Sequence, residues 1–209
     1  MRIAREGWPF IFPGVLLAVL AAWQGWWGGF LLLFALAGAL TFFFRDPRRL
    51  SPGGENGILS PADGKVLAIE TLPAANRLAA SATRVKIFLS LLDVHVTRSP
   101  VSGTVRRVER RSGRFLPAYR DEAGEQNKFV ALSVKGDTAD VFLKLIVGVA
   151  ARRIKCDLRE NDRVELGQKI GLMYFGSRVE IDFPAHAQPR VVIGQKVRAG
   201  ETVLAEVKK

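Results

Sequence analysis

The segment Phe129-Val-Ala-Leu-Ser-Val-Lys-Gly-Asp-Thr-Ala-Asp-Val-Phe-Leu-Lys-Leu-Ile-Val147 holds two runs of β-branched and apolar residues on either side of a Gly-Asp turn. Short runs of this composition, bounded by Gly, Pro, Asp or Asn, predict β-strands. The same character predicts strands at 85–89, 101–105 and 179–183. No window of about a dozen residues in this part of the chain shows a clear helical period. Residues 51–209 therefore predict a mainly β domain.

A short motif occurs twice near the C-terminal end. Val164-Glu-Leu-Gly-Gln-Lys-Ile-Gly171 is echoed by Val191-Val-Ile-Gly-Gln-Lys-Val-Arg198, and the second copy continues through Ala199-Gly-Glu-Thr-Val-Leu-Ala-Glu-Val207. A strand, a Gly-containing turn and another strand resemble the half-repeat of biotinyl and lipoyl domains. We therefore predict a barrel-sandwich-like β domain with an internal repeat. No hairpin clearly offers the exposed Lys that a lipoyl domain acylates, so the likeness extends to the architecture alone.

The N-terminal part has a different character, because residues 7–44 contain no Asp, Glu, Lys, Arg or His. One helix of this length would measure about 57 Å at ~1.5 Å per residue, nearly twice the ~30 Å hydrocarbon core of a bilayer. The Gly-rich turn Gln24-Gly-Trp-Trp-Gly-Gly29 divides the run into segments 8–23 and 30–44. We therefore predict a hydrophobic helical hairpin in residues 1–50 that inserts into a membrane.

Basic residues flank the two outer ends of this hairpin: Arg2 and Arg5 precede it, and Arg45, Arg48 and Arg49 follow it. By the positive-inside rule both ends lie in the cytoplasm, which places the protein on the cytoplasmic side of the cell inner membrane. A secretory signal would be shorter and would end in a small-x-small cleavage site. A buried hairpin of a soluble fold and a shallow re-entrant hairpin are the remaining interpretations.

Composition narrows the classes of site and partner. A single Cys excludes a disulfide framework, and one Cys with two His excludes a zinc cluster of the usual ligand count, so no metal is predicted. Without Arg2, Arg5 and Glu6, residues 45–209 hold 29 of the 31 basic and 19 of the 20 acidic side chains, a surplus of +10. Beside an apolar anchor, this surplus favours the anionic face of a membrane over nucleic acid.

Few side chains can transfer protons near neutral pH. His, with an unperturbed pKa of about 6.5, occurs only at positions 95 and 186. In Asp93-Val-His-Val-Thr97, an extended backbone puts His95 on one face with Asp93 and Thr97. Taken alone, His95 is equally a polar strand position, and His186, in a Pro-bounded loop, is an exposed loop residue.

Two turns carry other candidates. Asp63 precedes Gly64 in Ser60-Pro-Ala-Asp-Gly-Lys65, where Asp-Gly alone indicates a hairpin corner. Gly176-Ser177, in Tyr174-Phe-Gly-Ser-Arg-Val179, is in isolation an ordinary turn pair. Neither short segment is specific for a function by itself.

In combination these segments resemble the short, bacterial type of phosphatidylserine decarboxylase, a pyruvoyl-dependent enzyme made as a proenzyme. Their order, their spacing and the C-terminal position of the Gly-Ser pair all agree with that family. The segments that carry the resemblance are Phe44-Arg-Asp-Pro-Arg48, Ser60-Pro-Ala-Asp-Gly-Lys65, Asp93-Val-His-Val-Thr-Arg-Ser-Pro-Val-Ser-Gly103, Gln126-Asn127, Ala150-Ala-Arg-Arg-Ile154 and Gly171-Leu-Met-Tyr-Phe-Gly-Ser-Arg-Val179.

The resemblance implies that the chain cuts itself between Gly176 and Ser177. The products would be chains 1–176 and 177–209, which stay associated, and Ser177 would become a covalent pyruvoyl group. That ketone condenses with the amine of phosphatidylserine and accepts the electrons released as carbon dioxide leaves, so that phosphatidylethanolamine is the product. Residues 51–209 would then be the catalytic domain.

The resemblance also implies roles for other residues. His95 would return a proton to the decarboxylated carbon, with Asp63 as its partner, and both are candidates for activating Ser177 during self-cleavage. Arg98 and Arg178 could hold the carboxylate or phosphate of the lipid, because a guanidinium offers paired donors to such anions. The competing interpretation of both arginines is ordinary surface charge.

One position departs from the longer members of the family. They carry a second His three residues after the first and use an Asp-His-Ser set for self-cleavage, whereas this chain has Arg98 there. Either His95 serves both reactions or another group helps in the cut. The cleavage site also reads Phe-Gly-Ser-Arg rather than Leu-Gly-Ser-Thr, in keeping with the short type.

Two other functions fit the same sequence. One is the same chemistry on an archaeal-type ether-linked phosphoserine lipid, and the other is a non-catalytic barrel-sandwich adaptor tethered to a membrane. The adaptor predicts one polypeptide from the gene, whereas the enzyme predicts two. Exposed strand edges are also compatible with a homodimer.

Overall fold

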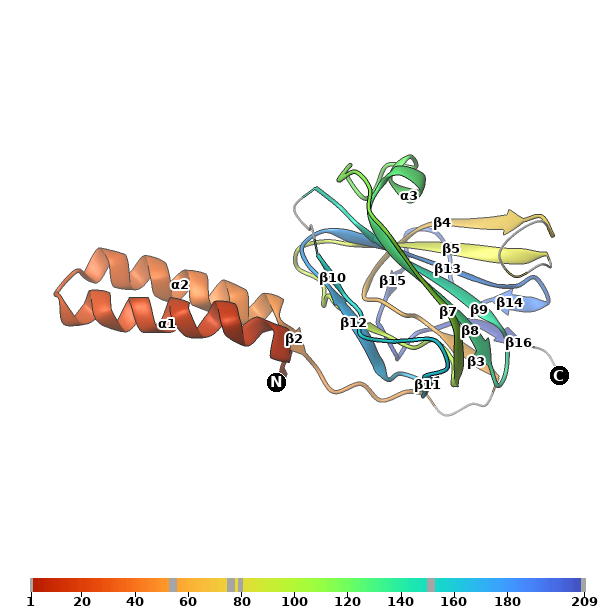
Figure 1. The fold of residues 1–209 in the computed structure, drawn as a ribbon, viewed down its shortest axis with the longest axis horizontal. Helices are drawn as coiled ribbons and strands as arrows, with labels where there is room; N and C mark the ends of the chain where they lie inside the picture. Colours follow the sequence, from red (N-terminus) through yellow and green to blue (C-terminus); the bar gives the residue numbers. More distant parts are fainter. Residues whose placement is uncertain (1, 53–55, 75–77, 79–80, 150–152, 208–209) are drawn as a thin grey trace. The chain divides into compact units, whose positions relative to one another are not determined.

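The computed structural model describes residues 2–52, 56–74, 78, 81–149 and 153–207 (Figure 1). The chain divides into two compact units, residues 1–48 and 49–209. Gly53 and Gly54, in the linker predicted at Pro52-Gly53-Gly54 because Pro and Gly there end the hydrophobic character of the chain, lie outside the described residues.

The first unit is a pair of apolar helices. The 3-10 helix η1 (Arg5–Gly7) leads into α1 (Trp8–Trp23), and α2 (Trp27–Phe43) runs back along it. Pro9 stands in the first turn of α1, where its missing N–H costs no hydrogen bond. The two-residue strands β1 (Arg2–Ile3) and β2 (Arg45–Asp46) pair antiparallel beyond the helices.

Small residues let these two helices approach closely. A Cβ on Gly14 would lie 3.6 Å from the Cβ of Ala37, and Ala18 and Ala21 are buried. Gly25 turns the chain between the helices with a φ of 75°. Among the described residues, Arg5–Trp23 is the one helix long and apolar enough to cross a membrane, and Trp27–Phe43 is a shorter apolar helix.

The second unit is built almost entirely of strands. Its elements are β3 (Gly57–Leu59), β4 (Gly64–Leu72), β5 (Ala82–Leu89), β6 (Val96–Arg98), β7 (Gly103–Arg111), α3 (Ala123–Gln126), β8 (Phe129–Gly136), β9 (Val141–Val147), β10 (Ile154–Lys155), β11 (Arg163–Val164), β12 (Lys169–Met173), β13 (Ser177–Pro184), β14 (Ala187–Pro189), β15 (Lys196–Val197) and β16 (Val203–Val207).

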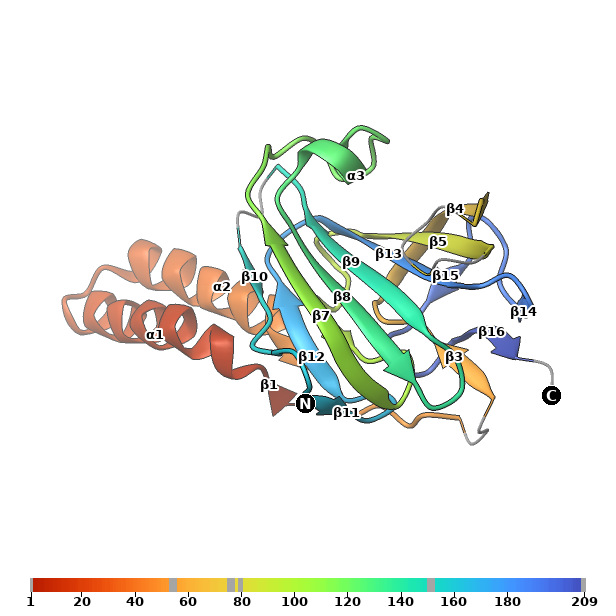
Figure 2. The same cartoon turned by 45° about the vertical axis from the view of Figure 1, so that its right-hand side comes forward.

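These strands form one large and two small antiparallel sheets. The large sheet has the order β11-β7-β8-β9-β13-β5-β4-β15, and the small sheets have the orders β10-β12-β6 and β14-β16-β3. Figure 2 shows the large sheet curling, with α3 and its flanking loops beyond one end of β7, β8 and β9. The strand β13 is bonded to β9 on one side and to β5 on the other.

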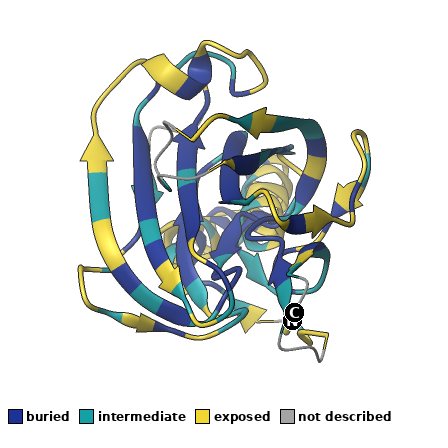
Figure 3. Cartoon of the chain, turned by 90° about the vertical axis from the view of Figure 1, so that its right-hand side faces the viewer, coloured by how far each residue is buried: buried dark blue, intermediate teal, exposed yellow. Residues whose placement is uncertain are grey.

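The core lies on the concave side of this curled sheet. Side chains alternate along β13, so that Val179, Ile181 and Phe183 enter the main apolar cluster. On the opposite face Arg178, Glu180 and Asp182 are also buried, which makes β13 covered on both sides. Figure 3 shows the same burial along the central strands of the sheet.

Two Ser-Pro-x-x-Gly segments, Ser60–Gly64 and Ser99–Gly103, are related by reciprocal hydrogen bonds. The Leu59 N–H donates to the Pro100 carbonyl and the Arg98 N–H donates to the Pro61 carbonyl, each at 2.9 Å. In each copy the Ser hydroxyl donates to the carbonyl two residues later, at 2.7 Å for Ser60 and 2.6 Å for Ser99. The domain therefore contains an approximate internal two-fold.

The same relation extends to the residues that face each Gly. Gly64 pairs with Val197, and Gly103 pairs with Val164. Two residues farther along, the Ala199 N–H donates to Asp63 Oδ1 and the Leu166 N–H donates to Ser102 Oγ, at 2.8 and 2.9 Å. Asp63 and Ser102 therefore occupy equivalent positions and cap equivalent amides.

The mainly β fold preceded by a helix pair is confirmed, with one correction of detail. The strand predicted at 101–105 is β7, which begins at Gly103 and continues to Arg111. The two Gly-Gln-Lys copies form the same turn, in which the side chains of Gln168 and Gln195 accept from the backbone N–H three residues earlier. The Ser-Pro-x-x-Gly segments form a second repeat, which a search for repeated turn residues could have found.

Candidate active site

Three strand ends meet at Ser177. It is the first residue of β13, and it pairs with Leu89 at the end of β5 and with Val147 at the end of β9. Because these neighbouring strands are antiparallel, the turn before β13 and the turns after β5 and β9 emerge at the same end of the sheet. The predicted cleavage site therefore lies where three hydrogen-bonded strands, β5, β13 and β9, begin or end together.

The backbone just before Ser177 is strained. Phe175 has a φ of 48° and Gly176 a φ of 58°, both in the left-handed region. A non-Gly residue there costs ~1–2 kcal/mol, whereas Gly adopts it freely. Gly148 also lies so close that a Cβ on it would overlap the Gly176 carbonyl oxygen. The peptide bond to be cut thus follows two consecutive left-handed residues and has its carbonyl against Gly148.

The Ser177 hydroxyl has no hydrogen-bond partner among the described residues, although it is fully buried. An unpaired buried hydroxyl costs roughly 1–3 kcal/mol, so it marks either strain or chemistry. Here the hydroxyl belongs to the residue next to the strained Gly176 carbonyl. No hydrogen bond in the described structure therefore has to break before Oγ can act as a nucleophile.

His95 is fully buried and contacts this turn directly. Its Nδ1 lies 2.9 Å from the Asp93 carbonyl oxygen, and its Nε2 lies 3.2 Å from the Gly176 backbone nitrogen. A carbonyl can only accept and an N–H can only donate, so the partners assign the neutral tautomer with the proton on Nδ1. The Asp93 carboxylate accepts from the N–H and hydroxyl of Ser90, which fixes the turn before His95.

Asp63 has its own set of partners. Its carboxylate accepts two hydrogen bonds from Arg49, at 2.9 and 2.7 Å, and one from the Ala199 N–H. Burial raises the pKa of Asp63, because lost hydration outweighs the bonds from Ala199 and Arg49 that hold the carboxylate ionised. These hydrogen bonds tie Asp63 to the linker and to the segment before β16, and none of them goes to His95.

The two predicted substrate arginines lie in different surroundings. Arg98 is partly exposed, and its Nη1 donates to the Gly167 carbonyl. Arg178 is 1% exposed and points away from the Ser177 side of β13. It forms a 2.9 Å ion pair with Glu180 and donates to the Arg120 carbonyl. Arg178 therefore ties β13 to the loop that carries α3.

Asn127 is a site residue whose role the sequence did not reveal. Its side chain is fully buried and accepts from the Leu116 N–H, while its Nδ2 donates to the carbonyls of Leu116 and Val147. Val147 is the residue of β9 that pairs with Ser177. Asn127 therefore anchors the loop before α3 to the strand end beside the cleavage site.

The other segments singled out from the sequence lie apart from this site or are not described. His186 is exposed in the turn between β13 and β14, at the far end of β13 from Ser177. Of the Ala150–Ile154 segment, Ala150, Ala151 and Arg152 lie outside the described residues. Arg153 is described, and its carbonyl accepts from the Tyr174 N–H just before the cleavage turn.

The arrangement is suited to an attack by Ser177 Oγ on the preceding carbonyl. A nucleophile needs a hydroxyl free of other bonds, a strained bond to break, and a group nearby that can accept and donate protons. Ser177, the Phe175–Gly176 turn and His95 supply these three features in one place. Among the described residues there is no group of three or more His, Cys, Asp or Glu that could hold a metal ion.

Comparisons with known proteins agree with this geometry. The family profile described as phosphatidylserine decarboxylase matches residues 36–205. Proteins named phosphatidylserine decarboxylase proenzyme are similar to this chain: that of Novosphingobium aromaticivorans is 41% identical, over 98% of this chain and 89% of its own length. Those of Paraburkholderia phymatum and Paramagnetospirillum magneticum are 39% and 37% identical, over 98% of this chain and 97% and 87% of their own lengths. The chain belongs to the phosphatidylserine decarboxylase family.

Proposed function

We propose that this chain is the proenzyme of a phosphatidylserine decarboxylase, which matures by cutting its own backbone before Ser177. The observation that carries the proposal is the buried, unbonded Ser177 hydroxyl next to two left-handed residues and to His95. Family membership supports the reaction, and the full-length match supports its assignment to the whole chain.

In the first step the Ser177 Oγ bonds to the Gly176 carbonyl carbon as the C–N bond of that peptide breaks. The hydroxyl proton passes to the departing nitrogen, so an amide becomes an ester and the left-handed turn is released. Loss of the Ser177 α-proton and of the Gly176 carboxylate then leaves dehydroalanine at position 177. Water hydrolyses it to a ketone and ammonia, which gives chains 1–176 and 177–209.

The residues present fit a pyruvoyl group at position 177. Ser177 is buried at the start of β13, and its hydroxyl makes no hydrogen bond. A smaller, planar group in place of this side chain therefore breaks no side-chain hydrogen bond. The pyruvoyl group supplies an electrophilic ketone for the lipid amine and an acceptor for the electrons released with carbon dioxide. Gly148 leaves room beside it, since its Cα faces the position of the Gly176 carbonyl.

His95 is proposed as the residue that handles protons in the decarboxylation. In the precursor its Nε2 is held by the Gly176 N–H. The cut detaches Gly176 from β13, so this hydrogen bond no longer ties the ring to the strand end. Nε2 is then available to bind a proton and to return it to the carbon that loses carbon dioxide. The Nδ1–Asp93 bond keeps the ring oriented throughout.

The other predicted site residues receive different proposals. Arg98 is retained as the candidate for the substrate carboxylate or phosphate, since it is the partly exposed member of the pair. For Arg178 we propose a positioning role through Glu180 and the loop at Arg120. For Asp63 the hydrogen bonds favour an anchoring role, and its assistance to His95 stays a prediction.

The substrate implies a membrane location. The apolar helix pair and the basic residues on its outer flanks support attachment to the cytoplasmic face of the inner membrane. Phosphatidylserine, an anionic phospholipid, is the proposed substrate. No described residue distinguishes acyl from ether chains, so an archaeal-type ether phosphoserine lipid is the alternative substrate.

Self-cleavage tests the proposal against the adaptor. Purified wild-type protein should give two bands on a denaturing gel. Intact-mass analysis should show that the N-terminus of chain 177–209 carries a ketone instead of an amino group. Ser177→Ala should remain one chain and release no carbon dioxide from phosphatidylserine vesicles. Ser133→Ala, on strand β8, which β9 separates from β13, is the matched control and should cleave normally. An uncut wild-type protein after prolonged incubation would support the adaptor and exclude the enzyme.

A further inference from the structure

Exposed apolar side chains gather around the candidate active site. Leu91 and Leu92 are 55% and 72% exposed in the turn after β5, and Val149 is 57% exposed just after β9. Tyr119 is 61% exposed in the loop before α3. In the described part of the β unit these are four of the seven exposed large apolar residues, the others being Leu50, Val192 and Ile193.

Strand pairing places these residues at one end of the sheet. Leu91 follows Leu89 and Val149 follows Val147, and both Leu89 and Val147 pair with Ser177. The loop of Tyr119 reaches the same end, because its neighbour Ala118 lies 3.2 Å from the position of a Cβ on Gly148. The Tyr119 ring also packs edge-on to Phe88, with centroids 6.2 Å apart. We call Leu91, Leu92, Tyr119 and Val149 the apolar rim.

The apolar rim lies at the end of the sheet where the candidate site is buried. Ser177 and His95 are fully buried, and the loops that carry Leu91 and Val149 come just after the residues that pair with Ser177. Exposed Leu and Tyr side chains clustered at a site mark a surface that contacts another apolar phase. Burial of one such side chain stabilises a contact by roughly 1.5–3 kcal/mol.

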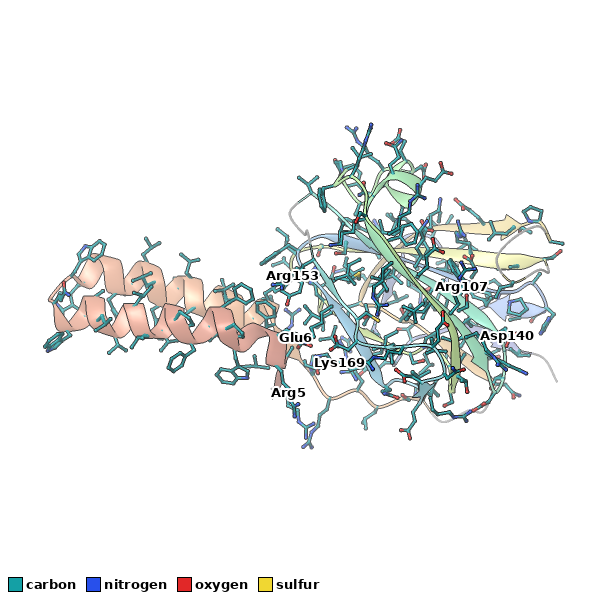
Figure 4. The ribbon with its side chains drawn as sticks, viewed as in Figure 1. Arg5, Glu6, Arg107, Asp140, Arg153 and Lys169 are labelled. Carbon is teal, nitrogen blue, oxygen red and sulfur yellow. The ribbon has the colours of Figure 1, made fainter. Side chains whose placement is uncertain are left out.

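Basic residues flank the same end. Arg153 is exposed, and its carbonyl bonds to the Tyr174 N–H beside the cleavage turn (Figure 4). Arg120 is exposed next to Tyr119, while the acidic Asp121 is paired with Lys86. A basic side chain near an anionic membrane surface contributes about 1 kcal/mol of attraction. An apolar rim with flanking arginines has the chemistry of a surface that inserts among anionic headgroups.

We propose that the apolar rim docks the β domain onto the lipid bilayer and seats the buried site on the headgroup layer. This inference rests on the proposed function, because it takes the substrate from the membrane. The lipid then keeps its acyl chains in the bilayer while its headgroup passes between the Leu91–Leu92 turn and Val149. The contact is separate from the apolar helix pair and is made by loops of the catalytic unit.

Kinetics with two forms of the substrate test the rim. The full-length Leu91→Ser/Leu92→Ser variant should lose about tenfold or more in kcat/KM on phosphatidylserine in vesicles, since about 1.4 kcal/mol corresponds to tenfold. On dihexanoyl phosphatidylserine below its aggregation concentration it should match the wild type. Val192→Ser/Ile193→Ser is the matched control: the pair is 68% and 64% exposed, beside β15 and β4, and should behave as wild type on both substrates.

The outcomes separate the rim from the proposed function. All variants should self-cleave completely, which shows that they fold and mature. A wild-type protein that neither cleaves nor decarboxylates would refute the proposed function itself. If the protein is active but the rim variant retains full activity on vesicles, or loses activity equally on both substrates, the membrane-docking rim is overturned.

A spectroscopic measurement gives a readout apart from activity. Leu92→Cys carrying an environment-sensitive fluorophore should shift to the blue when the full-length protein is reconstituted into phosphatidylserine-containing vesicles, and Val192→Cys should not. Burial raises the pKa of the Cys156 thiol, so the native cysteine should resist labelling. A blue shift at position 92 that depends on protein concentration in detergent without vesicles would indicate self-association and would contradict the bilayer contact.

Discussion

At the scale of single residues, the candidate site combines a strained backbone with an uncommitted nucleophile. Phe175 and Gly176 adopt left-handed conformations, and Ser177 Oγ is buried without a partner. Both features raise the free energy of the uncut chain, and the proposed self-cleavage would remove both. His95 contacts the same turn through the Gly176 N–H, so one neutral imidazole lies against the backbone that has to rearrange.

Asp63 allows an anchoring role to be separated from a role in proton transfer. Ser102, at the equivalent position of the internal repeat, caps the Leu166 N–H with a hydroxyl. Ser at position 63 should therefore still cap the Ala199 N–H. We expect Asp63→Ser to lose the ion pair with Arg49 and some stability with it, but to self-cleave within about threefold of the wild-type rate, because the buried cap, worth roughly 1–3 kcal/mol, is kept. Timed gels of newly synthesised protein give the rate.

The control for this comparison is Asp63→Ala, which loses the cap and should unfold at a lower temperature than Asp63→Ser. If Asp63→Ser stays uncut while its unfolding temperature equals that of the wild type, Asp63 takes part in proton transfer with His95. That result would restore the partner role predicted from the sequence.

The same carboxyl predicts a pH dependence. Burial raises its pKa above the value of about 3.9 in an unfolded chain, so the folded protein holds this proton to a higher pH. The stability contributed by Asp63 is therefore present below pH 3.9 and is lost as the pH rises through the folded-state pKa. In the uncut Ser177→Ala background, the free energy of unfolding should fall relative to Asp63→Ser as the pH rises above about 4. A difference that rises over this range would contradict the raised pKa.

At the scale of elements, β13 is tied to the loop around α3 by charged groups on its outer face. Arg178 donates to the carbonyl of Arg120, and Lys144 of β9 donates to that of Gly124. Asn127 bonds the start of the same loop to Val147. The loop is thus fixed to the two strands that end or begin at the cleavage site.

Removal of Arg178 should destabilise this arrangement. Arg178 and Glu180 are 1% and 3% exposed, so Arg178→Ala leaves the buried Glu180 with only its longer, 3.5 Å pair to Arg84 among the described ion pairs, and should cost up to about 3–5 kcal/mol of unfolding free energy. Arg190→Ala breaks the exposed pair with Glu206 and should cost less than about 1 kcal/mol. Denaturant unfolding of uncut protein measures both. Unchanged stability together with a raised KM for phosphatidylserine would instead assign Arg178 to substrate binding.

At the scale of the whole molecule, the proposed cut would divide one sheet between two chains. Residues 177–209 contribute β13, β14, β15 and β16, and β13 is bonded to β9 and β5, which would belong to chain 1–176. Val179, Ile181 and Phe183 of β13 remain in the apolar core. The packing that holds the short chain is therefore independent of the bond that is broken.

The mature chains should consequently stay together. After complete self-cleavage they should co-elute in size-exclusion chromatography in detergent, at the volume of the uncut Ser177→Ala protein, and separate only in denaturant. Burial of the apolar side chains of β13, each worth roughly 1.5–3 kcal/mol, gives the physical reason. Separation of chain 177–209 under native conditions would contradict this account.

The sequence by itself determined the class of fold, because strand composition and a long charge-free run are local properties. It also predicted His95 and Gly176-Ser177 as site residues from the order and spacing of short motifs. The described structure brings these together at one hydrogen bond. The Gly-Gln-Lys echo indicated a repeated turn, which both copies form, whereas the reciprocal Ser-Pro-x-x-Gly relation became visible only in the hydrogen bonds.

Only the tertiary structure decided the partners of the other candidates. Asp63 bonds to Arg49 and Ala199, and Arg178 to Glu180, through contacts set by strand register and by chain segments far apart in sequence. Strand register depends on which face of each strand the core buries and on hydrogen bonds such as that from Leu59 to Pro100, which no local pattern encodes. The sequence therefore fixes which groups are chemically able to react, and packing between distant segments selects those that meet.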